Sequence, residues 1–77
     1  MDSMTSSPLP VTTPKRLVAA LTRLGFYVVR QKGSHIQLKR GNLTVTVPMH
    51  PRDLAPGTLR SILRQARLSK EELKEAL

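Results

Sequence analysis

The spacing of apolar residues divides the chain into helical and extended segments. In the first segment, apolar side chains recur at steps of three and four residues: Leu17, Val18, Ala20, Leu21 and Leu24. That spacing places them along one side of a helix. Thr13 followed by Pro14 supplies a hydroxyl N-cap and a proline in the first turn, and Gly25 suits a left-handed C-cap. The pattern therefore predicts a helix between Thr13 and Gly25.

Three extended segments follow. "FYVVRQ" (residues 26–31) is rich in β-branched and aromatic residues, while "HIQLK" (35–39) and "LTVTV" (43–47) alternate between apolar and polar positions. Gly33-Ser34 and Gly41-Asn42 separate these segments and suit two-residue primed turns. The sequence therefore predicts a three-stranded antiparallel meander.

Alternation assigns the side chains of the second and third strands to two faces. One face is apolar and carries Ile36, Leu38, Val45 and Val47. The opposite face, called the open face below, is polar and carries His35, Gln37, Lys39, Thr44 and Thr46. For the first strand both orientations stay open: either Phe26 and Val28 or Tyr27 and Val29 point inward.

The C-terminal third returns to helical spacing. Pro48 ends the sheet because proline cannot donate to a ladder. A helix is predicted around residues 56–67, with a buried side made of Leu59, Ile62, Leu63 and Ala66. Ser69 with Glu72 three residues later forms a capping box for a short last helix that reaches Leu77. This last helix has a thin apolar edge, and whether it is ordered without a partner stays open.

These elements predict an α+β fold of one domain over residues 13–77, preceded by a flexible tail rich in Ser, Thr and Pro over residues 1–12. With so few elements, both main helices should cover the apolar face of the sheet, which leaves the other face open. His35 should then be exposed on that open face, directly beside the Gly33-Ser34 turn.

Charge points to a polyanionic partner. The 77 residues include 13 Lys and Arg against 5 Asp and Glu, a net charge of +8. Between Pro14 and Leu68 the only acid is Asp53. Such a basic body favours nucleic acid through the release of counterions from phosphates. The alternative is that the excess charge only keeps a small protein soluble.

Several classes of site are excluded or disfavoured. The chain has no cysteine, which rules out disulfides, thiolate metal sites and cysteine nucleophiles. No carboxylates pair, and two histidines fifteen residues apart make a poor zinc site, so we expect no metal and no cofactor. The N-terminal stretch lacks the apolar core of a signal peptide, and no apolar run approaches ~18 residues. We therefore expect a cytoplasmic protein with no membrane partner.

The remaining candidate is an exposed histidine surrounded by basic residues, which is chemically sufficient for the cleavage of RNA. RNA carries its own nucleophile, the 2′-hydroxyl, and a histidine can accept its proton or protonate the leaving 5′-oxygen. Lysine and arginine stabilise the charge on phosphorus. A lone surface histidine is more often only a surface residue, and His50 in its proline-flanked loop has a structural interpretation beside a phosphate-binding one. Three arginines at helical spacing form either a solvated stripe or a contact surface for phosphate or an acidic partner: Arg60, Arg64 and Arg67.

Two blocks of this sequence resemble the HicA family of bacterial toxins, the messenger-RNA interferases of HicA–HicB toxin–antitoxin pairs. They are "GFYVVRQKGSHIQLKR" and "TVTVPMHPRDLAPGTLRSILRQARLS", within residues 13–69. The resemblance implies a fold like a double-stranded-RNA-binding domain and metal-independent endoribonuclease activity. It places the catalytic histidine of the Gly-Ser-His motif on His35. It also implies a HicB-like antitoxin that covers the active face and forms a hetero-oligomer with the toxin.

The expected RNA-binding residues surround that histidine and follow the second strand: Lys32, Gly33, Ser34, Gln37, Lys39 and Arg40. The sequence departs from the family at Ile36, where members often carry a polar residue, and at Arg67, where many have a glycine that closes the helix. Without that glycine we expect the helix to run on. Two other functions stay open: a non-catalytic RNA-binding module of the same fold, and a helix-turn-helix DNA-binding protein that uses the C-terminal helices.

Overall fold

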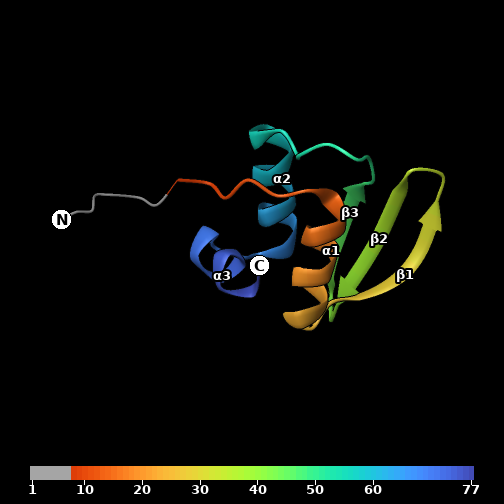
Figure 1. Cartoon of the computed structure of the whole chain (residues 1–77). Coiled ribbons are helices and arrows are strands. Elements are labelled where there is room, and N and C mark those ends of the chain that lie inside the picture. Colours follow the sequence, from red (N-terminus) through yellow and green to blue (C-terminus); the bar gives the residue numbers. More distant parts are fainter. Residues whose placement is uncertain (1–7) are drawn as a thin grey trace.

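The computed structural model describes residues 8–77, which form three helices and one sheet (Figure 1). Along the chain these are α1 (Pro14–Arg23), β1 (Tyr27–Lys32), β2 (His35–Arg40), β3 (Leu43–Pro48), α2 (Pro56–Ala66) and α3 (Lys70–Ala76). The sheet is antiparallel with the order β1-β2-β3. The predicted α+β class is confirmed: one helix, a three-stranded meander and two further helices, consistent with a double-stranded-RNA-binding-domain-like fold.

The helices pack on one side of the sheet, against the face that alternation marked as apolar. Leu38, Val45 and Val47 are fully buried there, and Ile36 packs at the margin of the core. From the helices, the core is completed by Leu17, Leu21, Leu59, Ile62 and Leu73. Among residues 8–77 no helix lies on the opposite face of the sheet, so the division into a covered and an open face is confirmed for this part of the chain.

Coverage of the sheet is uneven, because the helices lie over β3 while β1 forms the far edge (Figure 1). All six residues of β1 are exposed. Phe26, just before the strand, is 3% exposed and enters the core, whereas Val28 lies on the same side and is 47% exposed. The inward-pointing pair is therefore Phe26 and Val28, but only Phe26 reaches the helices.

The predicted ends of α1 are confirmed. The Thr13 side chain accepts a hydrogen bond from the backbone N–H of Arg16, and Pro14 occupies the first turn. After the helix, Gly25 has a φ of +97°, the left-handed region in which a side chain would be strained. The turn at Gly25 directs Phe26 back onto the helix, where its N–H donates to the carbonyl of Leu21.

The expectation that α2 runs on without a glycine cap is wrong. The helix ends at Ala66, and Arg67 itself adopts the left-handed cap conformation with a φ of +55°. The N–H of Leu68 then donates to the carbonyl of Leu63. Burial of Leu68 and of Leu73 on α3 requires a change of chain direction here, so packing imposes on an arginine a conformation that normally favours glycine.

The last helix is held by its cap and by α1. Ser69 and Glu72 form the predicted capping box: the Ser69 hydroxyl accepts from the Glu72 N–H at 3.0 Å, and the Glu72 carboxylate accepts from the Ser69 N–H at 2.8 Å. The Ser69 backbone N–H, and after it the Ser69 hydroxyl, stabilise the charged carboxylate and so lower the pKa of Glu72. Leu73 is fully buried, and Arg23 donates to the carbonyl of Ala76.

Two residues of the predicted tail, Leu9 and Thr12, contact the folded part of the chain. Thr12 is 1% exposed, and its carbonyl accepts from the N–H of Leu54 at 2.9 Å. Leu9 packs against the core at its margin. The rest of the expected tail, residues 1–7, lies outside the described residues.

Candidate nucleic-acid interface

His35 is held in place by the hairpin turn that precedes it. Gly33 has a φ of +57°, and Ser34 is not among the residues of positive φ, which is the pattern of a type II′ turn. This two-residue turn pairs Lys32 with His35 as the last pair of the β1–β2 ladder. His35 is therefore the first residue of β2, and it is exposed.

On the other side of β2, strand β3 also supports the end of the sheet at which His35 lies. Pro48 lies opposite His35, and the N–H of Met49 donates to the carbonyl of Ser34. That hydrogen bond extends the β2–β3 pairing one position past the strand and anchors the turn. Gly33 and Ser34, which the sequence placed among the RNA contacts, therefore form the hydrogen-bonded turn beside His35.

A β-bulge in β1 decides which basic side chains reach the open face. Val28 pairs with Leu38, a core residue, while Arg30 pairs with Gln37 on the open face, so Val29 is an extra residue in the ladder. Val28 and Arg30 are two positions apart and would share a face in a regular strand. Because of the bulge they lie on opposite faces, and Arg30 joins Lys32 on the side of His35.

These side chains surround a shallow hollow of about 180 Å³ on the open face. It is lined by Arg30, Lys32, His35, Gln37 and Thr46. Two permanent cations and one histidine meet there, and no carboxylate is among the lining residues. The local field therefore attracts anions, and a phosphate in the hollow would have both cations and the imidazole around it.

Arg30 and Thr46 were missing from the residues predicted to form the site. A signal for Arg30 was present in the sequence. A two-residue turn pairs Lys32 with His35 on the open face, whereas a buried Phe26 requires the even-numbered positions at the start of the strand to point inward. A regular strand can satisfy only one of these two requirements, because the two alternations differ by one position. One extra residue in a β-bulge allows the strand to satisfy both.

The other two predicted contacts on β2 lie away from the hollow. Lys39 pairs with Tyr27 and Thr44 at the far end of the open face. Arg40 turns toward the junction between α1 and β1: its guanidinium donates to the carbonyl of Leu24 at 2.7 Å and lies 4.8 Å from the centroid of the Phe26 ring. The structure therefore gives Arg40 a contact within the fold and does not bring it to His35.

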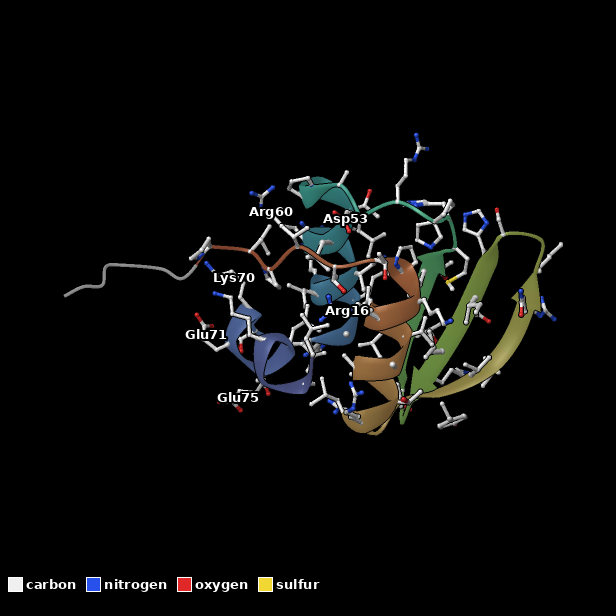
Figure 2. The ribbon with its side chains drawn as sticks, viewed as in Figure 1. Arg16, Asp53, Arg60, Lys70, Glu71 and Glu75 are labelled. Carbon is white, nitrogen blue, oxygen red and sulfur yellow. The ribbon has the colours of Figure 1, made fainter. Side chains whose placement is uncertain are left out.

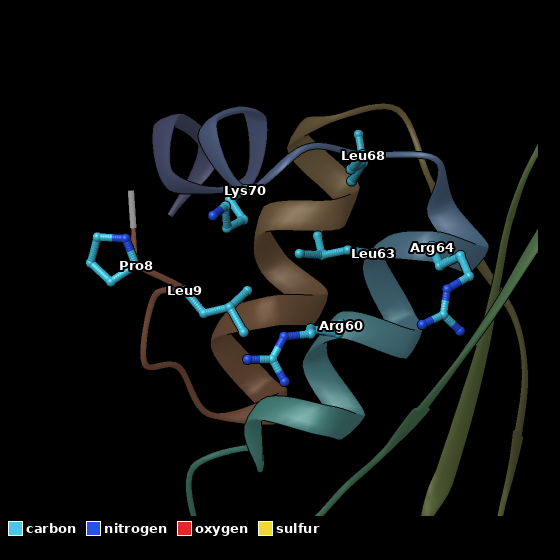
Figure 3. A pocket seen from close by; sticks show the side chains of 7 residues that line it. All are labelled: Pro8, Leu9, Arg60, Leu63, Arg64, Leu68 and Lys70. Carbon is cyan, nitrogen blue, oxygen red and sulfur yellow. The ribbon is translucent and has the colours of Figure 1, made fainter. Parts of the chain in front are cut away.

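The arginines of α2 are not among the residues that line the hollow beside His35. Arg60 and Arg64 border a second hollow of about 590 Å³ together with Leu9, Leu63, Leu68 and Lys70 (Figure 3). Arg67 forms the helix cap described above. Figure 2 shows that Glu71 and Glu75 project from α3, on the side of the molecule away from the β1–β2 hairpin.

His50 lies two residues beyond Pro48 and differs from His35 in its surroundings. Its Nδ1 atom is buried and has no hydrogen-bond partner among the described residues. Across residues 8–77, no group of three or more His, Asp or Glu side chains is placed to hold a metal ion. Over the same residues, no helix has the length and apolar character needed to cross a membrane.

The match to a protein family agrees with the two sequence blocks. A search of the curated proteins finds no match for the chain. The family described as the HicA toxin of bacterial toxin–antitoxin systems matches residues 14–68, which run from the first residue of α1 to the residue after the cap of α2. That match covers more than half of the 77 residues and includes the hairpin, the bulge and His35. The chain therefore belongs to the HicA family of toxins.

Proposed function

We propose that this toxin is a metal-independent endoribonuclease that cleaves messenger RNA and uses His35 for proton transfer. The observation that carries the proposal is the hollow on the open face, where His35 lies with Arg30 and Lys32 at the closed end of a hairpin. Family membership supports a toxin, and the composition of the hollow supports the choice of substrate and reaction.

The chemistry requires only groups that the hollow, the RNA and water supply. The 2′-oxygen attacks phosphorus, the bond from phosphorus to the 5′-oxygen breaks, and a 2′,3′-cyclic phosphate and a 5′-hydroxyl remain. His35 either accepts the 2′-hydroxyl proton or donates a proton to the leaving 5′-oxygen, and solvent water supplies or accepts the other proton. Arg30 and Lys32 stabilise the negative charge that builds on the phosphoryl oxygens. No step in this reaction requires a metal or a cofactor.

The remaining open-face residues extend the RNA contact beyond the scissile phosphate. Gln37 and Thr46 line the hollow and offer hydrogen bonds to phosphate or sugar. Ser34 lies beside His35 in the turn, where its hydroxyl or a backbone N–H can approach the same phosphate. Lys39 adds positive charge farther along β2, whereas Arg40, engaged with Leu24 and Phe26, is not part of this proposed surface.

The antitoxin partner of this toxin is proposed to be HicB-like and to cover the open face, where it excludes RNA from His35. Arg60 and Arg64 are then available outside the hollow beside His35 for an additional contact with an acidic segment of the same partner. The complex is proposed to form in the cytoplasm, where messenger RNA is accessible.

Two other functions fit the residues less well. A non-catalytic RNA-binding module would use the same charged face, but it gives no reason for an exposed histidine between two cations. A helix-turn-helix would present α3 to DNA. That helix has seven residues, buries Leu73, and carries exposed acids at Glu71 and Glu75, which phosphates repel.

Inducible expression in a bacterial host tests the proposal. The unmodified chain should arrest growth and deplete messenger RNA, and His35→Ala should do neither at equal levels of soluble protein. Co-expression of the antitoxin should restore growth. Growth arrest by His35→Ala equal to that of the unmodified chain contradicts the role of His35, and RNA binding without any cleavage by the unmodified chain favours the non-catalytic module.

A further inference from the structure

The open face is ordered into three rows that cross the sheet from β1 to β3. They are Lys32–His35–Pro48, Arg30–Gln37–Thr46 and Tyr27–Lys39–Thr44. Side chains of directly paired residues project to the same face, so each row forms one line across it. The first two rows contain the hollow around His35. In the third row, Lys39 adds positive charge for RNA, whereas Tyr27 and Thr44 have no role in the reaction proposed above.

Tyr27 stands out in this third row. The chain has one tyrosine, one phenylalanine and no tryptophan, and Phe26 is buried in the core. Tyr27 is therefore the only Phe, Tyr or Trp side chain on the open face, and it is 55% exposed. The register places it directly opposite Lys39. An exposed ring beside a lysine combines an apolar surface with positive charge at one point of the sheet.

We propose that Tyr27 is a stacking site for one base of a single-stranded RNA whose scissile phosphate lies at His35. This inference rests on the proposed function, because it places the RNA on the open face. Aromatic rings on a charged sheet face are the usual means by which proteins hold unpaired bases without reading their sequence. Lys39 would contact the phosphate beside the stacked base.

The separation of the two sites fits a short single strand. Lys39 follows His35 by four residues along β2, which corresponds to about 13 Å. That length equals about four nucleotides at the rise of a stacked strand, and fewer when the strand is extended. The RNA would cross the Arg30–Gln37–Thr46 row between these points, where Arg30 can contact the intervening backbone.

The same β-bulge allows Tyr27 to lie on the open face together with Arg30. From the turn, regular alternation would direct Lys32 and Arg30 outward and Tyr27 inward. The extra residue at Val29 reverses the phase, so that Tyr27 also faces outward while Val28 turns to the helix side. Exposed apolar side chains at a sheet edge favour aggregation. A base stacked on Tyr27 would cover one of them.

Tyrosine fluorescence tests the stacking directly, because all of it comes from Tyr27. The His35→Ala chain is titrated with a single-stranded RNA decamer of uridine, with N-acetyltyrosinamide as the control for light absorbed by the RNA. We expect the fluorescence of Tyr27 to be quenched as the RNA binds. This variant keeps the third row intact, so the result does not depend on whether His35 is catalytic.

Matched variants separate stacking from other effects. In the His35→Ala background, Tyr27→Leu should raise the dissociation constant for the decamer about fivefold or more, the effect of losing one stacked base, and Tyr27→Phe should leave it unchanged. Val28→Ala, the neighbour on the other face, is the control and should change nothing. An unchanged affinity of Tyr27→Leu, or an equal loss in Val28→Ala, overturns the proposal. Loss of antitoxin binding with unchanged RNA binding also overturns it and assigns Tyr27 to the partner protein.

Discussion

Arg30 and His35 lie on the same face of the sheet, whereas Val28 lies on the opposite face, toward the helices. In a regular strand Val28 and Arg30 would share a face, because they are two positions apart. The extra residue at Val29 shifts the alternation of side chains by one position. Before it, the alternation directs Phe26 into the core. After it, the alternation directs Arg30 and Lys32 to the open face. The bulge therefore joins a folding requirement to the proposed active site.

Arg30→Ala should lower RNA cleavage and leave the fold intact. Arg30 is exposed, lines the hollow with His35, and is proposed to stabilise charge on the transferring phosphoryl group. Removal of one such donor typically lowers the rate by a factor of about 100 to 1,000 in dedicated oxyanion sites. We expect at least a tenfold loss in kcat/KM, measured on a fluorogenic RNA, because Lys32 remains.

Arg40→Ala is the matched control, since it also removes an arginine from the same hairpin. Arg40 donates to the carbonyl of Leu24 and lies over the ring of Phe26, so its loss should lower the free energy of unfolding by about 2 kcal/mol. The folded variant should cleave RNA nearly as fast as the unmodified chain. If Arg40→Ala loses cleavage and keeps its stability while Arg30→Ala behaves in the opposite way, the two roles are exchanged.

Arg67→Gly should stabilise the protein. The left-handed conformation of Arg67 costs a residue with a side chain roughly 1–2 kcal/mol, whereas glycine adopts it freely. Part of that gain is offset because glycine is more flexible in the unfolded chain, so we expect a net increase of about 0.5–1 kcal/mol in urea unfolding.

Arg64→Gly provides the comparison on the same helix. Arg64 lies within α2, where glycine should cost about 1 kcal/mol. A loss of stability in both variants would show that the Arg67 side chain contributes more than its backbone conformation costs. Loss of antitoxin binding in Arg67→Gly would separately identify that side chain as a contact for the partner.

The capping box should make stability depend on pH in the acidic range. The hydrogen bonds from Ser69 lower the pKa of Glu72 below its ordinary value of 4.5. A carboxyl group whose pKa is lower in the folded state stabilises the fold above its unfolded pKa, and that contribution is lost as the pH falls through the folded pKa. The difference in unfolding free energy between the unmodified chain and Glu72→Gln should therefore be present at pH 7 and shrink below about pH 4.

Equilibrium urea unfolding at several pH values measures that difference. Glu71→Gln is the control, because Glu71 belongs to the same turn of α3 but is not in the capping box. A gap between Glu72→Gln and the unmodified chain that stays constant down to about pH 3 would mean that the carboxylate charge contributes nothing to the cap.

Much of the fold is predictable because its signals are local. The spacing of Leu17 and Leu21, the cap at Thr13 and the Ser69–Glu72 pair each specify structure within a few residues. The alternation in β2 and β3 likewise assigns His35 to the open face without reference to any distant segment. These elements agree with the final packing, so local patterns and tertiary contacts give the same answer.

The rest depends on contacts between distant segments. The end of α2 is set by the need to bury Leu68 and Leu73, which overrides the absence of a glycine at position 67. Arg40 was expected to contact RNA because it is basic and ends β2, but the path of the chain at Leu24 and Phe26 captures its guanidinium. Neither the end of α2 nor the contact of Arg40 produces a periodic pattern in the sequence.

The most direct test of the central claim is cleavage of a short RNA by the purified chain in the presence of EDTA, with identification of the product ends. The account predicts products that end in a 2′,3′-cyclic phosphate and a 5′-hydroxyl, and no cleavage of a substrate that lacks the 2′-hydroxyl at the scissile nucleotide. It also predicts a loss of at least about 100-fold in rate for His35→Ala, the lower end of what general acid–base catalysis contributes. Cleavage by folded His35→Ala at the unmodified rate would contradict the account.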